Sequence, residues 1–110
     1  MEANGDCFEV AGTMILDNPM VHALTLVHGI VTGQGPIEGV EHVHAWVEDS
    51  DAMVALDFSN GNAVVVPIDQ YYKIGKIRKT ARYDRKETVN ALVQTGVWGP
   101  WEDWLKEVDP

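Results

Sequence analysis

Apolar residues occupy every second position on both sides of an acidic loop in the middle of the chain. They are Val43, Ala45 and Val47 before the loop at positions 49–52, and Val54, Leu56 and Phe58 after it. This alternation is typical of half-buried strands, and it predicts a β-hairpin from His42 to Phe58 with one apolar face. If the loop centres on Ser50 and Asp51, His44 lies directly across from Asp57 on the other face. An imidazole next to a carboxylate is a supported general base.

Three further stretches of apolar or β-branched residues, each bounded by turn residues, predict strands. They lie at positions 24–31, 63–67 and 76–83. Asn60-Gly61, between the hairpin and the second of these strands, is the strongest short turn signal in the chain. With this turn at the corner, Asp57 faces Val64, and the strand that carries Asp57 becomes central in the sheet.

Two segments carry the pattern of a capped helix start, in which an acidic N-cap is followed three residues later by Glu. Asp6 begins a helix that we expect to run to about Leu16, and Asp84 begins a second one that ends at Gly96. We expect the apolar face of the second helix to consist of Val89, Leu92 and Val93. Shorter helices are predicted at positions 68–74, with Gly75 as the end, and from Pro100, where the apolar stripe is Trp101, Trp104 and Leu105.

The order of these elements predicts an α+β fold. An N-terminal helix is expected to pack on a mostly antiparallel sheet, and two helices follow near the C-terminus. The 110 residues suffice for one compact domain with a modest core, so we expect residues 1–110 to form a single domain.

Charge and hydropathy exclude several classes of protein. The net charge of −9 argues against a nucleic-acid-binding protein, because neutralising phosphates needs a basic surface. No apolar run approaches the ~20 residues of a membrane span, and the first residues lack the pattern of a signal peptide. We therefore expect a soluble, cytoplasmic protein without a membrane partner.

The positive charges are concentrated in one segment, since seven of the eight basic residues fall between Lys73 and Lys86. The simpler interpretation is an edge strand whose lysines and arginines prevent another strand from adding to the sheet. The alternative is a docking strip for an acidic partner or for an anionic group of a substrate.

Cys7, the single cysteine of the chain, lies in the first turn of the predicted N-terminal helix. Unpaired backbone N–H groups and the helix dipole favour a thiolate at that position. With His44 as the base and Asp57 as the group that orients it, the sequence contains the parts of a Cys-His-Asp triad in that order.

Four segments in this order resemble the motifs of the transglutaminase-like superfamily of cysteine enzymes, which is itself papain-like. They are Gly5-x-Cys7-x-x-x-Ala11 at a helix start, the strand Leu26-Val27-His28-Gly29, then His44-Ala45-Trp46-Val47-Glu48, and Leu56-Asp57-x-Ser59. His-Ala-Trp-Val-Glu is the most specific of these motifs, and together they span about half of the chain, from about position 5 to about position 60.

The resemblance implies a papain-like core in which Cys7 is the nucleophile, His44 the general base and acid, and Asp57 the orienting carboxylate. It also implies an acyl-enzyme intermediate formed from a peptide, a protein or a small amide or ester, by a peptidase, amidase, deamidase or acyltransferase. Asn4 or Gln34 is the candidate side-chain donor of an oxyanion hole, beside the backbone N–H of Cys7.

Two alternatives remain open. The chain could be a minimal enzyme of this superfamily, from a phage or a bacterium, or it could have kept the fold and lost the activity, for example as a phage or prophage accessory protein that binds a partner. Trp46 shares the predicted face of His44 and could wall the active site, although packing against the N-terminal helix explains it equally well.

The histidines do not indicate a metal site. His42 and His44 would share one face of a strand, with His22 or His28 as a third ligand, but no third ligand has a motif spacing. His28 is expected to be a hydrogen-bonded core or edge residue. We therefore expect neither a metal nor another cofactor.

Overall fold

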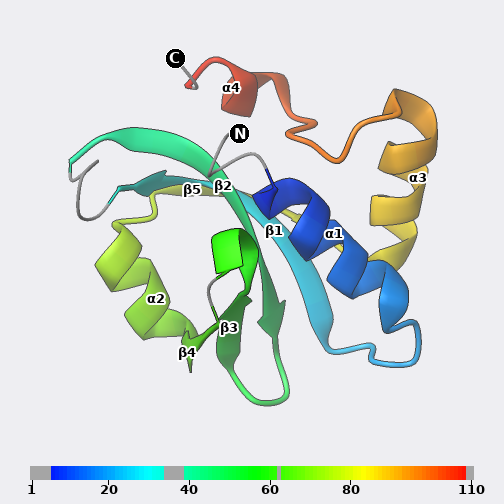
Figure 1. The fold of residues 1–110 in the computed structure, drawn as a ribbon, viewed down its shortest axis with the longest axis horizontal. Helices are drawn as coiled ribbons and strands as arrows, with labels where there is room; N and C mark the ends of the chain where they lie inside the picture. The colour runs from blue at the N-terminus through cyan, green and yellow to red at the C-terminus, as the bar shows by residue number, and fades with distance from the viewer. Residues whose placement is uncertain (1–5, 34–38, 62, 109–110) are drawn as a thin grey trace.

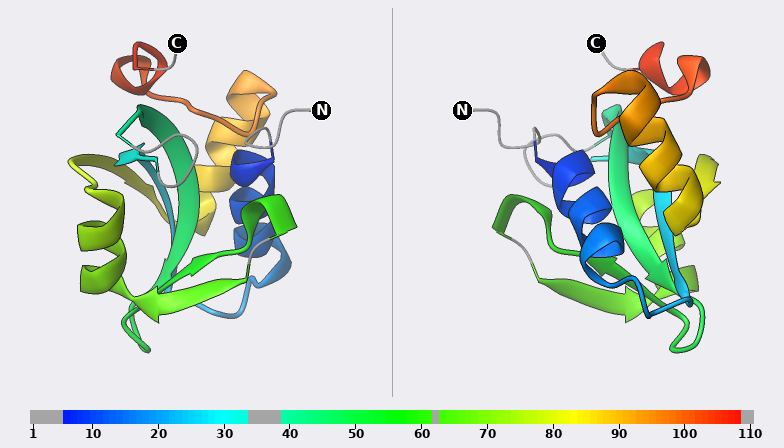
Figure 2. Two further views of the ribbon diagram at one scale, coloured as in Figure 1. Left: turned by 60° about the vertical axis from the view of Figure 1, so that its left-hand side comes forward. Right: turned by 90° about the vertical axis from the view of Figure 1, so that its right-hand side faces the viewer.

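The chain folds into an antiparallel sheet with helices on both faces (Figures 1 and 2). The computed structural model describes residues 6–33, 39–61 and 63–108, and all elements named below belong to these ranges. The helices are α1 (Cys7–Asp17), α2 (Ile68–Gly75), α3 (Arg85–Thr95) and α4 (Asp103–Lys106), with a 3₁₀ turn η2 (Ser59–Gly61). The strands are β1 (Leu24–Thr32), β2 (Glu41–Asp49), β3 (Val54–Asp57), β4 (Val64–Pro67) and β5 (Lys79–Tyr83). The predicted α+β class is confirmed.

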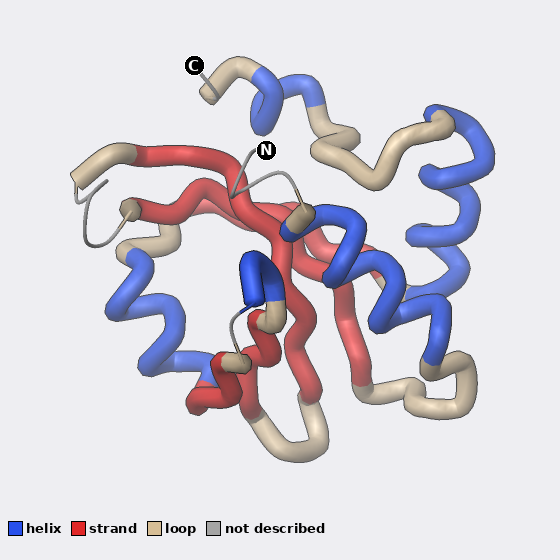
Figure 3. Tube along the Cα trace, viewed as in Figure 1, coloured by secondary structure: helices blue, strands red, loops and turns tan. Residues whose placement is uncertain are grey.

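The strands follow the order β4-β3-β2-β1-β5, and every neighbouring pair is antiparallel (Figure 3). The long ladder between β1 and β2 runs from Leu24 opposite Asp49 to Thr32 opposite Glu41. β3 lies between β2 and β4, and Asp57 faces Val64 as the Asn60-Gly61 turn predicted. The strand that carries Asp57 is therefore an interior strand.

The hairpin of β2 and β3 differs from its predicted register by two residues. Val47 pairs with Leu56, not with Val54, and Asp49 is the residue opposite Val54. The prediction that His44 lies directly across from Asp57 is therefore wrong, because the loop between Asp49 and Val54 centres one residue later, on Asp51 and Ala52. Since side chains alternate with a period of two, this shift leaves each residue on its predicted face.

Each face of the sheet packs against its own helix layer. Figure 2 shows α2 on one side of the sheet and α1 with α3 on the other. The α1 side buries Leu26, Ala45 and Val47 against Cys7, Ala11 and Ile15, and the α2 side buries Val27, Val31, Trp46 and Ala55 with Tyr71, Tyr72 and Ile77 packed against them. Burial of a large apolar side chain stabilises the fold by about 1.5–3 kcal/mol, so both layers contribute to holding β2 in place.

The helix ends agree with the sequence patterns in part. At α3, Asp84 and Glu87 form the predicted capping box, and Gly96 ends the helix with a φ of 73°. At α1, Asp6 occupies the N-cap position, but its side chain makes no capping hydrogen bond, so the capping box predicted there is not formed. The αL residue that ends α2 is Lys76 instead of Gly75. On α3, Val93 is 80% exposed and Thr88 is buried, so the predicted apolar face is partly wrong.

The segment after α3 returns across the helices and reaches the sheet. The ring of Trp98 covers Gly12 of α1 so closely that a Cβ at that position would lie 2.7 Å from Trp98 Cε3. Further along, Leu105 of α4 is fully buried against Ile30 and Val43. The position of α1, and with it that of Cys7, is thus fixed by the C-terminal segment as well as by the sheet.

The basic segment contains an edge strand, as the simpler interpretation predicted. β5 lies at the end of the sheet beside β1. Arg78 makes an ion pair with Glu41, with 2.7 Å from Nε to the carboxylate, and Arg82 makes one of 2.6 Å with Glu48. In the part of the chain that the structure describes, no helix is both long enough and apolar enough to span a bilayer.

Candidate functional site

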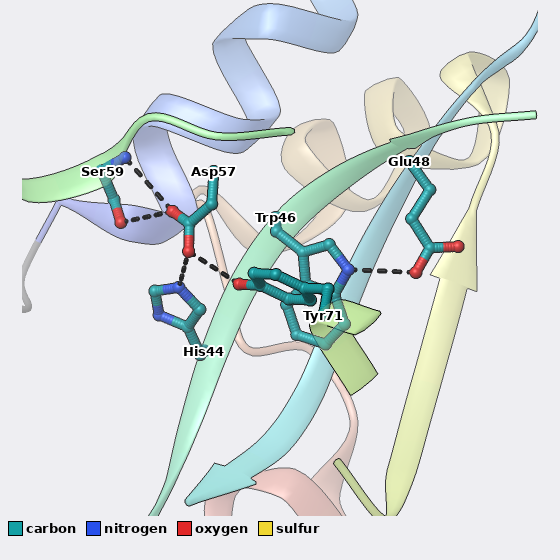
Figure 4. A network of polar contacts seen from close by, with 6 residues as sticks. All are labelled: His44, Trp46, Glu48, Asp57, Ser59 and Tyr71. Atoms are coloured by element: carbon teal, nitrogen blue, oxygen red, sulfur yellow. Dashed lines mark hydrogen bonds and ion pairs between the residues drawn. The ribbon is translucent and has the colours of Figure 1, made fainter. Parts of the chain in front are cut away.

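His44 of β2 and Asp57 at the end of β3 lie in contact, joined by a hydrogen bond of 2.8 Å from Nε2 to Oδ2 (Figure 4). Both side chains are largely buried, with exposed fractions of 13% and 12%. The register shift places them diagonally, and their shared face still lets them meet because diagonal neighbours in a sheet are within reach of long side chains. The predicted contact between His44 and Asp57 therefore exists, although the two residues are diagonal neighbours and do not lie directly opposite each other.

The carboxylate of Asp57 accepts hydrogen bonds on both oxygens. Oδ1 accepts from the backbone N–H of Ser59 at 3.3 Å and from its Oγ at 2.8 Å, and Oδ2 accepts from the phenol of Tyr71 at 2.7 Å as well as from His44 (Figure 4). Burial raises the pKa of Asp57, but the hydrogen bonds from His44, Tyr71 and Ser59 outweigh it and lower this pKa to about 2. Asp57 is therefore an ionised acceptor at neutral pH.

An ionised carboxylate has no proton to donate, so Nε2 of His44 carries the hydrogen in its bond to Asp57. Cys7 lies close enough to His44 to interact with it as well, and Nδ1 is the ring nitrogen that the bond to Asp57 leaves available. Burial lowers the pKa of His44, but the hydrogen bonds and charges of Asp57 and Cys7 outweigh it and raise this pKa to about 9. His44 is thus hydrogen-bonded to one of the two other members of the predicted triad and close to the second.

Local chain geometry explains how Cys7 reaches His44. The ladder between β2 and β3 joins Val47–Asp49 to Val54–Leu56, so it ends before His44. α1 contacts both β2 and η2 at this end of the hairpin. Cys7 is the first residue of α1, and it lines one pocket together with Asp57 and Ser59.

Access to Cys7 is restricted. Its side chain is 1% exposed, and the pocket above it is lined mainly by apolar residues of α1, β2 and β3, together with Asp57 and Ser59. This pocket contains about 170 Å³ of space between atoms, but a water-sized sphere does not fit in it. A substrate would therefore have to displace one of these side chains, such as Phe58, which is 38% exposed.

A second carboxylate lies further along the same face of β2. Glu48 is 3% exposed, and it accepts hydrogen bonds from Trp46 Nε1 at 3.0 Å, from the phenol of Tyr72 at 2.7 Å and from Arg82 at 2.6 Å. The ring of Trp46 is fully buried and stacks on that of His44, with 6.1 Å between the centroids and 23° between the planes. Trp46 thus supports His44 from the side, and its indole N–H is already bound to Glu48.

His28 departs from its expected role. It is fully buried among the rings of Phe8, Tyr83 and Trp101, with centroid distances of 4.8, 5.1 and 4.9 Å. Neither ring nitrogen has a hydrogen-bond partner among the described residues, so the expectation of a hydrogen-bonded histidine is wrong. Burial lowers the pKa of His28 to about 3, and the imidazole is therefore neutral.

Several other predicted features can be placed. Asn4 and Gln34, the candidate oxyanion-hole donors, lie outside the described residues. Among residues 6–33, 39–61 and 63–108, no three His, Cys, Asp or Glu side chains gather as they would around a metal ion. A cavity of about 570 Å³ lies between the C-terminal end of α1 and the start of α3, away from the triad at the other end of α1.

Sequence reasoning missed Ser59 and Tyr71 as partners of Asp57. Ser59 could have been found, because Asp-x-Ser places a hydroxyl and an N–H next to the carboxylate in an Asx-type turn. Tyr71 gave no such signal, since it follows Asp57 by fourteen residues and lies on a separate helix.

Comparison of this chain with protein-family models, with curated proteins and with solved structures finds no significant match. The transglutaminase-like assignment consequently depends on the motifs and on the geometry of the site.

Proposed function

We propose that the protein is a thiol enzyme of the transglutaminase-like, papain-like kind, which acts on an amide or ester through an acyl-enzyme. The observation that carries this proposal is the arrangement of His44, which is hydrogen-bonded to Asp57 and interacts with Cys7, while Cys7 and Asp57 line the same pocket. A nucleophile, a base and a group that orients the base are the three parts that this chemistry needs.

In the proposed mechanism, the Cys7 thiolate attacks the carbonyl carbon of the substrate. The protonated His44 gives its proton to the leaving amine or alcohol as the carbon–heteroatom bond breaks, and a thioester remains on Cys7. Water or an amine then attacks this thioester and gives a proton to His44, and the acyl product leaves as the C–S bond breaks. Asp57 keeps the imidazole oriented in both steps.

The class of substrate follows only from the resemblance. A peptide, a protein or a small amide fits an acyl-enzyme mechanism, and peptidase, amidase, deamidase and acyltransferase activities use the same triad. The backbone N–H of Cys7, with Asn4 or Gln34, is the proposed oxyanion hole.

Alkylation of Cys7 by iodoacetamide tests the proposal. We expect the wild-type thiol to react near neutral pH faster than a model thiol, and His44→Ala to slow the reaction by about tenfold or more, because the thiolate loses its cationic partner. His42→Ala is the matched control: His42 lies two residues away on β2, with its ring centroid 6.1 Å from that of His44. A rate that does not depend on His44 would contradict the triad.

A catalytically silent interaction module is the second candidate, and the observation that favours it is the burial of Cys7. For such a module we expect alkylation of Cys7 to be slower than that of a model thiol in both the wild type and His44→Ala. An acidic partner at Lys73–Lys86 stays a prediction of this candidate. Such a partner would compete with Glu41 and Glu48 for Arg78 and Arg82, and a double charge reversal of these arginines should abolish its capture.

A further inference from the structure

Asp57 is held by three separate parts of the chain. His44 comes from β2, Ser59 from η2 and Tyr71 from α2, and each bond has a heavy-atom distance of 2.7–3.3 Å. Ser59 is two residues from Asp57, so its bonds are local and would form in any turn of this shape. Tyr71 is the partner that depends on how α2 packs against the sheet, because it lies on a separate helix, fourteen residues beyond Asp57 in the chain.

Tyr71 and His44 donate to the same oxygen of Asp57, the Oδ2 atom. Two donors on one carboxylate oxygen restrict rotation of the carboxyl group about the Cβ–Cγ bond, since rotation would break both bonds at once. The ring of Tyr71 is also held against Trp46, with 5.2 Å between centroids, and Trp46 stacks on His44. The phenol is therefore fixed at both ends, by its ring and by its hydroxyl.

The protonation state of Tyr71 fits this arrangement. Burial raises the pKa of Tyr71 well above its ordinary value, and the negative charge of Asp57 adds to the increase. The phenol stays protonated and acts as a donor, so Asp57 receives a neutral hydrogen bond and keeps its full negative charge for His44.

We propose that Tyr71 is a positioning residue of the Cys7-His44-Asp57 site, which keeps the Oδ2 atom of Asp57 in line with Nε2–H of His44 and so holds the imidazole ring in the orientation that presents Nδ1 to Cys7. This proposal rests on the proposed function, and it adds to the triad a supporting residue from α2. Tyr71 touches neither the substrate nor the reacting sulfur in this role. It acts only through Asp57.

The neighbouring tyrosine supplies a matched control. Tyr72 also lies on α2, and its phenol also donates to a buried carboxylate at 2.7 Å, but that carboxylate is Glu48. Tyr71→Phe and Tyr72→Phe each remove one hydroxyl and one such bond while keeping the ring. Tyr72→Phe also removes the 3.3 Å bond that Arg82 donates to this phenol. A loss of stability is expected from both variants, and a change at His44 is expected from Tyr71→Phe alone.

Two measurements on the full chain separate a positioning role from a purely structural one. The first is the ¹⁵N NMR spectrum of the His44 ring, in which the N–H bound to Asp57 should give a protected Nε2–H signal. In Tyr71→Phe we expect this hydrogen to exchange with water about tenfold faster, the ratio that corresponds to one hydrogen bond to a charged group. The second is the rate of Cys7 alkylation by iodoacetamide, which should fall by a similar factor in Tyr71→Phe and remain near the wild-type rate in Tyr72→Phe.

A double-mutant cycle with Asp57→Ala shows whether Tyr71 acts through Asp57. Once the carboxylate is absent, Tyr71→Phe should have no further effect on alkylation or on His44 exchange. Equal effects of the two tyrosine variants on the His44 signal, or an undiminished effect of Tyr71→Phe in the Asp57→Ala background, would overturn the proposal. The NMR measurement does not require a reactive thiol, so it tests Tyr71 even if His44→Ala shows that Cys7 is not activated.

Discussion

Replacing His28 with leucine should make the protein less sensitive to acid. His28 is fully buried among three aromatic rings with neither nitrogen hydrogen-bonded among the described residues, and its pKa is lowered from 6.5 to about 3 by burial. In the unfolded chain this histidine takes up a proton below 6.5, and in the folded protein it does not do so until about 3. The unfolded state therefore binds more protons in this range, and stability falls as the pH decreases.

The magnitude follows from the pKa of the unfolded state. Each pH unit below 6.5 costs about 1.4 kcal/mol of unfolding free energy, so His28 costs about 2 kcal/mol at about pH 5 and almost nothing at about pH 8. The pKa of His28 in the folded protein has almost no effect on this free energy, because at about pH 5 the folded His28 is still neutral. Leucine has a similar volume and does not titrate, so its effect on packing is the same at both pH values.

The wild-type curve alone would not reveal this cost. The pKa of His44 is raised to about 9, so His44 contributes stability that is fully present below 6.5 and is lost as the pH rises through about 9. The two histidines therefore act in opposite directions between about pH 5 and about pH 8. Both proteins contain His44, so its contribution cancels when the unfolding free energy of the wild type is subtracted from that of His28→Leu at each pH.

Urea unfolding followed by far-ultraviolet circular dichroism is the suitable assay, because tryptophan fluorescence would respond directly to the change beside Trp101. We expect the unfolding free energy of His28→Leu, relative to that of the wild type, to increase by about 2 kcal/mol from about pH 8 to about pH 5. His22→Gln removes an exposed histidine and should show a smaller change. A relative stability of His28→Leu that does not depend on pH would refute the conclusion that His28 is buried in its neutral form.

Two further predictions concern the elements that hold the site. Gly12→Ala should lower the unfolding free energy by about 1–3 kcal/mol in urea unfolding, since the new Cβ would lie 2.7 Å from the Trp98 ring, whereas alanine at an exposed helix position would add stability. Asp84→Ala should lower the unfolding free energy by about 1 kcal/mol, because it removes the 2.8 Å bond from the Glu87 N–H to the Asp84 carboxylate. Asp84→Asn keeps a capping acceptor and should lower the unfolding free energy by less. An unchanged Tm in Gly12→Ala, or equal losses in the two Asp84 variants, would contradict these explanations.

The sequence alone was sufficient for features that depend on neighbouring residues. The capping box of Asp84 and Glu87 and the end of α3 at Gly96 formed as predicted, because their hydrogen bonds and dihedral angles involve only a few consecutive residues. The turn signal at Asn60-Gly61 likewise predicted correctly that Asp57 faces Val64. The faces of the hairpin were also correct despite the register shift, because alternation with a period of two is unchanged by a shift of two residues.

Contacts between distant segments were decided by the tertiary structure. The meeting of Tyr71 with Asp57 depends on how α2 packs against the sheet, and the bond of Arg82 to Glu48 depends on which strand lies beside β1. The burial of His28 without a hydrogen bond likewise results from three rings that come from α1, β5 and the C-terminal segment. None of these pairs has a fixed spacing along the chain, so no local pattern could predict them. The residue types of the triad were visible in the sequence, and their mutual geometry came from the packing of α1 and α2 on opposite faces of one sheet.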